Sequence, residues 1–245
     1  MKLLAFDTST EVLSIGVDCD GVQLLHTGSG GAQASFGLIA GVQSLLQQTA
    51  QPMDALDVIV FGAGPGSFTG LRTACSVAQG LALGAQRPVL PVNSLLAVAE
   101  DARGRTQPDA TALEVLALLD ARMDEVYAAW FGWSDGQWQQ RGEIQLCKPE
   151  ALQVDDSVQL LAGNVFTVYP GRVEQSMGPH VRPCVAALPS AQALLRLAPA
   201  LLQQGAAVPP EGALPLYVRD KVAKTTAERM QEKAAAADLA GVARV

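Results

Sequence analysis

The chain has 245 residues, of which 49% are hydrophobic and 17% are charged, with a formal net charge of −7. This length can bury a substantial core, as one large domain or as two smaller lobes. The acidic balance argues against a chain that holds nucleic acid by itself, because phosphate binding needs a basic face. A local basic group near the end is interpreted as a solvated charged helix: Arg219, Lys221, Lys224, Arg229 and Lys233.

Cysteine spacing and hydropathy indicate in which cellular compartment the protein resides. The four cysteines (Cys19, Cys75, Cys147 and Cys184) include no CxxC pair, which suits reduced thiols better than a disulfide framework or a zinc site. The sequence opens on a short strand-like run rather than on a signal peptide, and no apolar run reaches the length of a membrane span. We therefore expect a cytoplasmic protein without membrane attachment.

The first part of the chain predicts the order strand, strand, strand, helix, strand. Three short strands separated by polar turns are expected over Lys2–Phe6, Val12–Val17 and Val22–Leu25. A helix is expected over Phe36–Thr49, where apolar residues recur at the spacing of one helix face. A buried strand over Val58–Phe61 follows this helix.

A glycine-rich turn at residues 62–67 then opens a helix of very small residues, expected over 68–85. Arg72 is the only charged residue between Asp57 and Arg87, so this helix needs cover on nearly every side. Two rows at i, i+4 spacing permit close approach by two neighbours; the rows are Ala74, Ala78, Ala82 and Ser76, Gly80, Gly84. One neighbour is the sheet of its own lobe. The other is either the preceding helix or a helix of another chain.

The second half of the chain repeats this order of elements. Strands are expected over Leu113–Leu119, Tyr127–Trp133, Trp138–Leu146 and Val158–Ala162, followed by a helix over Ala191–Gln204. A βββαβα unit that occurs twice predicts an α/β protein with two lobes around a cleft. We expect an N-terminal lobe over 1–106, a C-terminal lobe over 107–224 and a helical tail over 225–245. The tail begins with a capping-box pattern, Thr225-Thr-Ala-Glu228.

An acidic residue ends the first strand of each lobe, which is compatible with a nucleotide site in the cleft. In two-lobed phosphotransferases such carboxylates hold a metal, and the turn at 64–70 resembles a phosphate loop. This turn lacks the Gly-Lys-Ser/Thr ending of a P-loop, so a close-packed turn before a helix explains it equally well. Side-chain caps of a hairpin are the alternative for the acidic turn. The candidate cleft residues are Asp7, Thr8, Ser9, Gly64, Gly66, Ser67 and Asp120.

Other catalytic chemistry has little support in the sequence. Ser67 lacks the flanking glycines of a nucleophile elbow. The two histidines, His26 and His180, form no HxxxH or HExxH pattern and have no Ser-His or Cys-His spacing. A peptidase is therefore the least supported alternative, and we expect no metal site.

Six stretches of the chain carry a family resemblance: Leu4–Thr10, Gly64–Arg72, Ala78–Gly84, Val92–Leu95, Asp120–Tyr127 and Pro215–Arg219. They are similar to the TsaB (YeaZ) family, bacterial partner subunits for threonylcarbamoyladenosine formation on tRNA. The resemblance implies the two-lobed actin/hexokinase/Hsp70-like (ASKHA) fold. It also implies a non-catalytic scaffold or dimerisation subunit that binds the catalytic subunit TsaD, with TsaE joining the assembly. Such an assembly is required for N6-threonylcarbamoyladenosine in tRNAs that read codons beginning with adenine.

The resemblance further implies an interface made by two N-lobe helices, over Ser35–Thr49 and Phe68–Gly84. Its occupant is TsaD or, without TsaD, a second copy of this chain. ATP and metal would belong to the partner subunits, and tRNA would be contacted only through the complex. A nucleotide-binding, ATPase-like enzyme that uses the cleft is the alternative function. The expected interface residues are Leu38, Ile39, Val42, Leu45, Leu46, Phe68, Leu71, Arg72, Cys75, Ser76, Gly80, Leu83 and Gly84.

Overall fold

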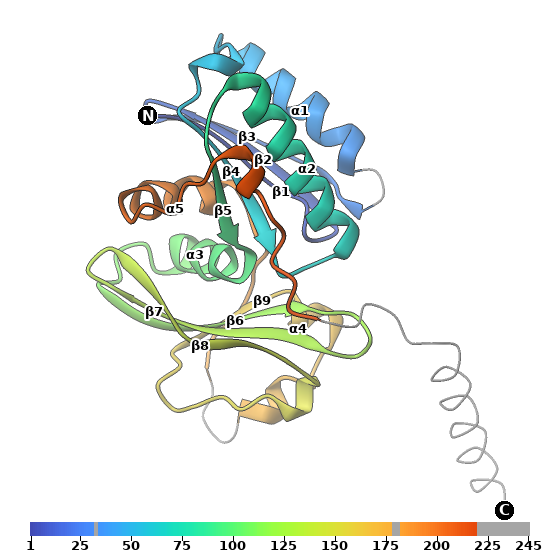
Figure 1. Ribbon diagram of the computed structural model, residues 1–245. Coiled ribbons are helices and arrows are strands. Elements are labelled where there is room, and N and C mark those ends of the chain that lie inside the picture. Colours follow the sequence, from blue (N-terminus) through green and yellow to red (C-terminus); the bar gives the residue numbers. More distant parts are fainter. Residues whose placement is uncertain (32–33, 178–181, 220–245) are drawn as a thin grey trace, which may run out of the picture.

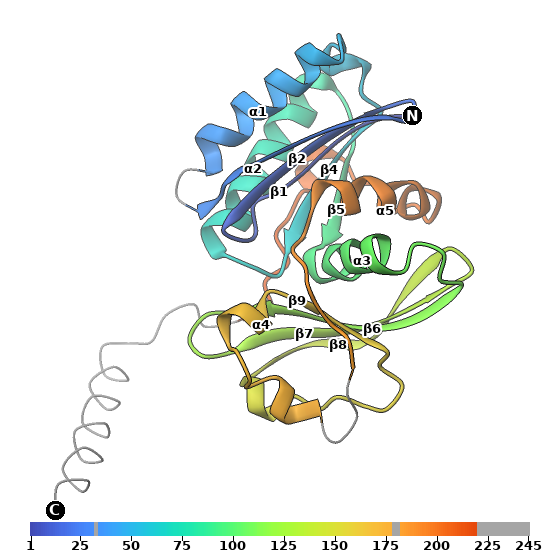
Figure 2. The same ribbon diagram turned by 180° about the vertical axis from the view of Figure 1, so that it is seen from behind.

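The computed structural model describes residues 1–31, 34–177 and 182–219. They form two lobes, each built on one five-stranded sheet (Figures 1 and 2). The predicted tail over 225–245, its capping box and His180 lie outside the described residues. None of the helices in the described ranges has the length and apolar character of a membrane span.

The first sheet contains the predicted strands and one more. Its strands are β1 (Lys2–Asp7), β2 (Val12–Cys19), β3 (Val22–Ser29), β4 (Val58–Gly64) and β5 (Val89–Asn93). They lie in the order β3-β2-β1-β4-β5, with β1 antiparallel to β2 and parallel to β4. Every residue of β4 is buried, because helices α2, α3 and α5 pack against this strand. Its sequence is accordingly a nearly continuous apolar run, as is typical of a parallel strand covered on both faces.

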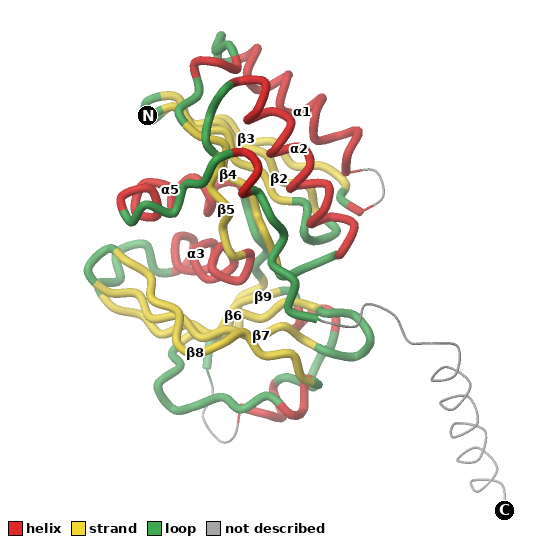
Figure 3. The backbone as a smooth tube through the Cα atoms, viewed as in Figure 1, coloured by secondary structure: helices red, strands yellow, loops and turns green. Residues whose placement is uncertain are grey.

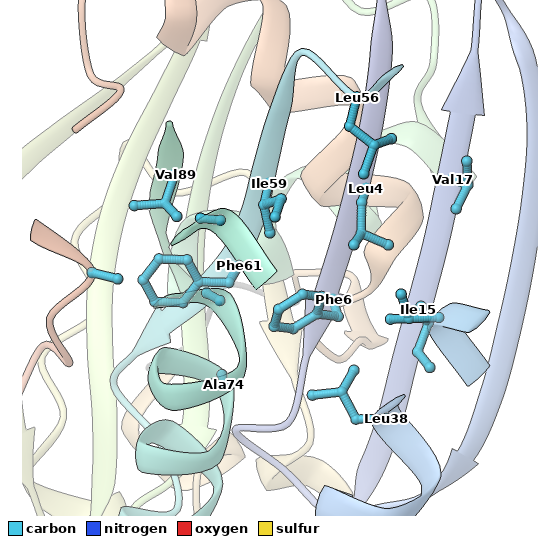
Figure 4. Close-up of a cluster of buried hydrophobic side chains, with 14 of the residues drawn as sticks. Leu4, Phe6, Ile15, Val17, Leu38, Leu56, Ile59, Phe61, Ala74 and Val89 are labelled. Atoms are coloured by element: carbon cyan, nitrogen blue, oxygen red, sulfur yellow. The ribbon is translucent and has the colours of Figure 1, made fainter. Parts of the chain in front are cut away.

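Helices α1 (Ala34–Gln48) and α2 (Phe68–Ala85) pack on one face of this sheet. Leu38 from α1 and Ala74 from α2 meet Phe6 and Phe61 of the sheet in a fully buried cluster (Figure 4). Ser67 caps α2 at its start, where its side chain accepts a hydrogen bond from the Gly70 amide. A short 3₁₀ turn, η2 (Met53–Ala55), precedes β4.

The second sheet repeats the topology of the first. Its strands are β6 (Ala112–Asp120), β7 (Val126–Ser134), β8 (Gln137–Cys147), β9 (Leu160–Gly163) and β10 (Cys184–Ala186). Read from β8, the order β8-β7-β6-β9-β10 corresponds strand by strand to the first sheet. The predicted duplication and the two-lobed α/β class are confirmed. The counterpart of α1 is reduced to the 3₁₀ turn η3 (Pro149–Ala151). The remaining short elements are the one-turn helix α4 (Val165–Val168) and the 3₁₀ turns η4 (Glu174–Met177) and η5 (Pro210–Gly212), of which η5 contacts α2.

Two helices, α3 (Ser94–Thr106) and α5 (Ala191–Gln203), lie between the sheets (Figure 3). Helix α3 contacts β6 and β9 of the second sheet, whereas α5 contacts β1 and β2 of the first. The Ala191 amide donates to the Ser14 hydroxyl over 2.8 Å. Residues 191–203, which the sequence places in the C-terminal lobe, therefore complete the core of the N-terminal one.

A buried ionic cluster joins α3, α5 and β8. Glu100 is 2% exposed and accepts hydrogen bonds from Arg103, Trp138 and Arg196. Burial disfavours the charged form of Glu100, but these three donors outweigh it and hold the pKa of Glu100 below its usual value. The cluster is satisfied internally and fixes the packing of α3 against α5.

Candidate functional site

The two rows of small residues on α2 face opposite environments. Ala74, Ala78 and Ala82 are fully buried against the sheet, which is the first neighbour that their spacing predicts. Gly80 and Gly84, in the second row, are exposed, and a Cβ at either would meet no other atom within 4 Å. The described part of the chain therefore leaves the second row of α2 open to an external neighbour.

Large apolar side chains of the neighbouring helices α1 and α2 are also exposed. Phe36 is 84% exposed, Leu83 is 72% exposed and Ile39 is 46% exposed. Helix α1 carries no charged residue, and α2 carries only Arg72. We call this surface the outer helix face; it consists of Phe36, Ile39, Ser76, Gly80, Leu83 and Gly84. Phe36 is absent from the residues expected at the interface, although it lies one turn before Ile39 and Ala40 on the same side of α1.

Six of the residues expected at the interface are buried inside the lobe. Leu38, Val42, Leu45, Leu46 and Cys75 belong to its main apolar core, and Leu71 is 2% exposed. They form the sheet-facing sides of α1 and α2, the usual fate of the apolar stripe of an amphipathic helix. Burial also raises the pKa of the Cys75 thiol to about 11. These residues add no exposed area to the outer helix face.

The start of α2 forms a cluster with a segment late in the chain. The rings of Phe68 and Tyr217 stack with centroids 5.5 Å apart, and the Arg72 guanidinium lies 3.9 Å from the Phe68 centroid. Arg72 Nε donates to the Tyr217 hydroxyl over 3.0 Å. Farther along α2, Gln79 donates to the Ala213 carbonyl over 3.0 Å. The sequence predicts an extended piece against one lobe for the family-like stretch that contains Tyr217, but its local pattern does not predict the contact with α2.

Asp7, the acidic end of β1, is sealed inside the N-terminal lobe. It is fully buried and accepts hydrogen bonds from the Ser9 amide and hydroxyl, each over 2.7 Å, and from the Ser94 hydroxyl over 3.2 Å. Burial raises the pKa of Asp7 to about 6, against the opposing effect of these donors. A Cβ on Gly62 would overlap the Asp7 carboxylate, so only glycine permits this approach of β4 to the acidic turn.

The glycine-rich turn packs directly on the turn that follows β1. The Ser67 amide donates to the Ser9 carbonyl over 2.7 Å, and the Thr8 hydroxyl donates to the Gly70 carbonyl over 2.7 Å. A Cβ on Gly70 would overlap the Thr8 carbonyl oxygen. This geometry favours a close-packed turn before a helix over a phosphate loop, because the Ser67 amide and the backbone at Gly70 are engaged by the turn that follows β1.

A cavity of about 450 Å³ lies between the lobes, beside these turns. Of the candidate cleft residues, Ser9, Gly66, Ser67 and Asp120 line it, whereas Asp7, Thr8 and Gly64 do not. The two carboxylates that end β1 and β6 therefore do not face a common space. The chain segment at residues 216–219 forms another wall, held to the N-terminal lobe where the Leu216 amide donates to the Ala63 carbonyl over 2.7 Å.

Asp120 organises the turn that follows β6. It accepts hydrogen bonds from the Arg122 amide over 2.8 Å and from the Tyr169 hydroxyl over 2.7 Å. Burial and the bond to Asp120 raise the pKa of Tyr169 to about 12. Arg122, Met123 and Asp124 have φ values of 60°, 55° and 65°, a left-handed run that costs about 1–2 kcal/mol per residue. No three His, Cys, Asp or Glu side chains of the described ranges are grouped to hold a metal ion.

The duplicated sheet order and the helices packed between the two sheets define a protein of the two-lobed actin/hexokinase/Hsp70-like class. A family model described as "TsaD: tRNA N6-adenosine threonylcarbamoyltransferase" matches residues 37–227. The TsaB protein of Escherichia coli, a tRNA threonylcarbamoyladenosine biosynthesis protein, is 33% identical over 91% of this chain and 96% of its own length. The Haemophilus influenzae TsaB is 31% identical over 91% of this chain and 95% of its own length.

A solved structure extends the similarity to the backbone. YeaZ from Pseudomonas aeruginosa superimposes with a TM-score of 0.78 at 37% identity, over 89% of this chain and 99% of its own. The chain belongs to the TsaB (YeaZ) family.

Proposed function

We propose that this chain is a non-catalytic scaffold subunit that binds TsaD through the outer helix face, with TsaE joining the assembly. In this role it is required for N6-threonylcarbamoyladenosine in tRNAs that read codons beginning with adenine. A second copy of the chain occupies the same face when TsaD is absent. The chain acts in the cytoplasm, meets tRNA only through the complex and carries no cofactor of its own.

The observation that carries this proposal is the open row on α2, together with three exposed apolar side chains on α1 and α2. Gly80 and Gly84 leave room for a neighbouring helix to approach closely, because the distance between packed helices depends on the side chains at their contact. Phe36 and Ile39 on α1 and Leu83 on α2 add exposed apolar area. An exposed apolar surface of this kind, almost free of charge, is typical of a protein–protein interface.

The geometry around Asp7 disfavours the alternative, a nucleotide-hydrolysing enzyme. A carboxylate that holds a metal–phosphate complex has to face the cavity, and Asp7 instead faces Ser9 and Ser94 inside the lobe. The turn at 64–70 is occupied by its contacts with Thr8 and Ser9. The scaffold role agrees with this arrangement, since it requires only that the turn places α2.

Reconstitution of tRNA modification tests the proposed function. TsaD, TsaE, the threonylcarbamoyl donor, ATP and unmodified tRNA are combined with and without this chain, and modified adenosine is measured by mass spectrometry. We expect product only when the chain is present, and an unchanged rate when the chain carries Asp7→Asn. Equal product without the chain would refute a required subunit. Loss of product with a folded, TsaD-binding Asp7→Asn variant would instead favour the nucleotide enzyme.

A further inference from the structure

The cavity between the lobes presents polar groups that the scaffold role does not use. Tyr127 on β7 lines this cavity and is only 6% exposed. Within the described residues its hydroxyl makes no hydrogen bond, whereas the Tyr169 hydroxyl donates to Asp120 and the Tyr217 hydroxyl accepts from Arg72. Among the described residues, the buried side-chain atoms without a partner belong to Arg87 and Trp130, so the Tyr127 hydroxyl is not buried; it opens onto the cavity, where it is available to a ligand.

Two further hydrogen-bond donors face the same space. The Asn164 side-chain oxygen accepts from the Asp120 amide over 2.9 Å, which leaves the Asn164 NH₂ group available at the cavity wall. The Arg122 side chain is 75% exposed and makes one ion pair, to Asp120 over 3.3 Å, so most of its N–H groups stay available. The cavity therefore offers donors from three different parts of the C-terminal lobe.

The turn that carries Arg122 is fixed by its surroundings. Its three left-handed residues are held by Asp120 from within and by Arg172, which donates to both Asp124 and Glu150. From the opposite side, Arg219 donates to the carbonyls of Ala121 and Arg122 over 3.1 and 3.4 Å. Left-handed backbone that several contacts hold in place is a feature of preorganised ligand sites.

The charges and walls of the cavity restrict the ligand class. Among the described residues, the charged ones that line the cavity are Glu11, Asp120, Arg122 and Arg219, so two carboxylates balance two guanidiniums there. A polyphosphate would bring several negative charges against a described lining without net positive charge, whereas a single carboxylate can use the free N–H groups of Arg122. Apolar wall is supplied by Leu71, Leu119, Met123 and Leu216.

We propose that this cavity binds a small monocarboxylate with an apolar or aromatic body. Its carboxylate accepts hydrogen bonds from the Tyr127 hydroxyl, the Asn164 amide and the Arg122 guanidinium. Its body packs against the apolar walls, of which Leu216 lies in the segment that also contacts α2. The site is complete within one chain, so it does not depend on TsaD.

Binding is tested on the full chain by NMR of ¹³C-methyl methionine, with phenylacetate as the probe. The chain has five methionines, and the Met123 signal is identified by its loss in Met123→Leu. We expect phenylacetate to shift the Met123 signal with a Kd of about 1–10 mM, the range for a ligand of this size. Phenylacetamide, which lacks the charge, and phenyl phosphate, which carries more of it, are expected to bind at least about 5-fold more weakly.

Three variants assign the binding to the proposed groups. Tyr127→Phe and Arg122→Gln are each expected to weaken phenylacetate about 5- to 10-fold, because each removes one donor to a charged oxygen. Lys2→Gln removes the same charge at the opposite end of β1 and is expected to change nothing. The proposal is overturned if the Met123 signal does not move, if phenylacetamide or phenyl phosphate binds as well, or if Tyr127→Phe and Arg122→Gln bind like the wild-type chain.

Discussion

Gly80→Leu is expected to weaken association with TsaD by about 100-fold or more while the N-terminal lobe stays folded. The leucine side chain would project from the open row of α2, where a Cβ meets no atom of the described chain. It would therefore not clash within the lobe, and it replaces the helix-breaking glycine with a better helix former, a gain of about 0.5–1 kcal/mol. Co-purification and a titration of TsaD measure the association, and thermal unfolding measures the fold.

Three matched variants separate the contact of α2 with TsaD from the packing of α2 inside its own lobe. Gly80→Ala raises helix propensity similarly but adds one methyl group, and we expect it to bind TsaD within about 10-fold of the wild-type chain. Ala78→Leu lies on the buried row and should cost about 1–3 kcal/mol of stability through overpacking. Gln203→Leu adds an exposed leucine on α5 and should leave association unchanged. Association of Gly80→Leu at wild-type affinity would show that the partner docks elsewhere.

Asp7→Asn is expected to stabilise the chain near neutral pH by up to about 3 kcal/mol. The pKa of Asp7 rises from 3.8 to about 6 on folding, because its carboxylate loses solvent. The ionised carboxylate is therefore less stable in the folded chain than in the unfolded one. Below about pH 4 Asp7 is protonated in both states and does not lower the free energy of unfolding; between about pH 4 and about pH 6 this free energy falls, and above about pH 6 the full loss is present. Asparagine keeps the acceptor for Ser9 without the charge.

Urea unfolding of both chains at about pH 4 and about pH 7.5 measures this difference. The two unfolding free energies should converge at the lower pH and diverge at the higher one. Asp135→Asn, which removes a carboxylate from an exposed turn, provides the matched control and should give nearly the same difference at both values. A destabilised Asp7→Asn at neutral pH would mean that the ionised carboxylate contributes favourably to the fold.

Local sequence patterns determine most of this fold but not which sheet each helix covers. The period-2 and period-3.6 patterns placed the predicted strands, α1, α2 and α5 within a few residues of where they lie. The leucines of α5 fit an apolar surface of either sheet, and only the finished structure seats Leu194 and Leu195 beside Leu3 and Val60. Such long-range pairing leaves no signal in the local spacing.

The same limit applies to the interface and the cleft. A helix that is apolar on several sides does not reveal from its sequence which side meets its own sheet, so Leu38 and Val42 were grouped with Ile39 although only Ile39 is exposed. Asp7 and Asp120 occupy equivalent positions in the repeat, yet the close approach at Gly62 seals only the first. For Tyr127 the sequence predicts a strand position within a family-like stretch but no role in a cavity, because a hydrogen bond that is not made has no sequence pattern.

Hydrogen–deuterium exchange of the full chain, alone and saturated with TsaD, tests the scaffold account most directly. The outer helix face lies on two segments, α1 at 34–48 and α2 at 68–85, and TsaD should slow amide exchange in both. The exposed strand β8 in the C-terminal lobe serves as the internal reference and should exchange at an unchanged rate. Slower exchange confined to α1 and α2 is the predicted result. Unchanged exchange in these helices, with slowing at β8 or elsewhere in the C-terminal lobe, would contradict the account.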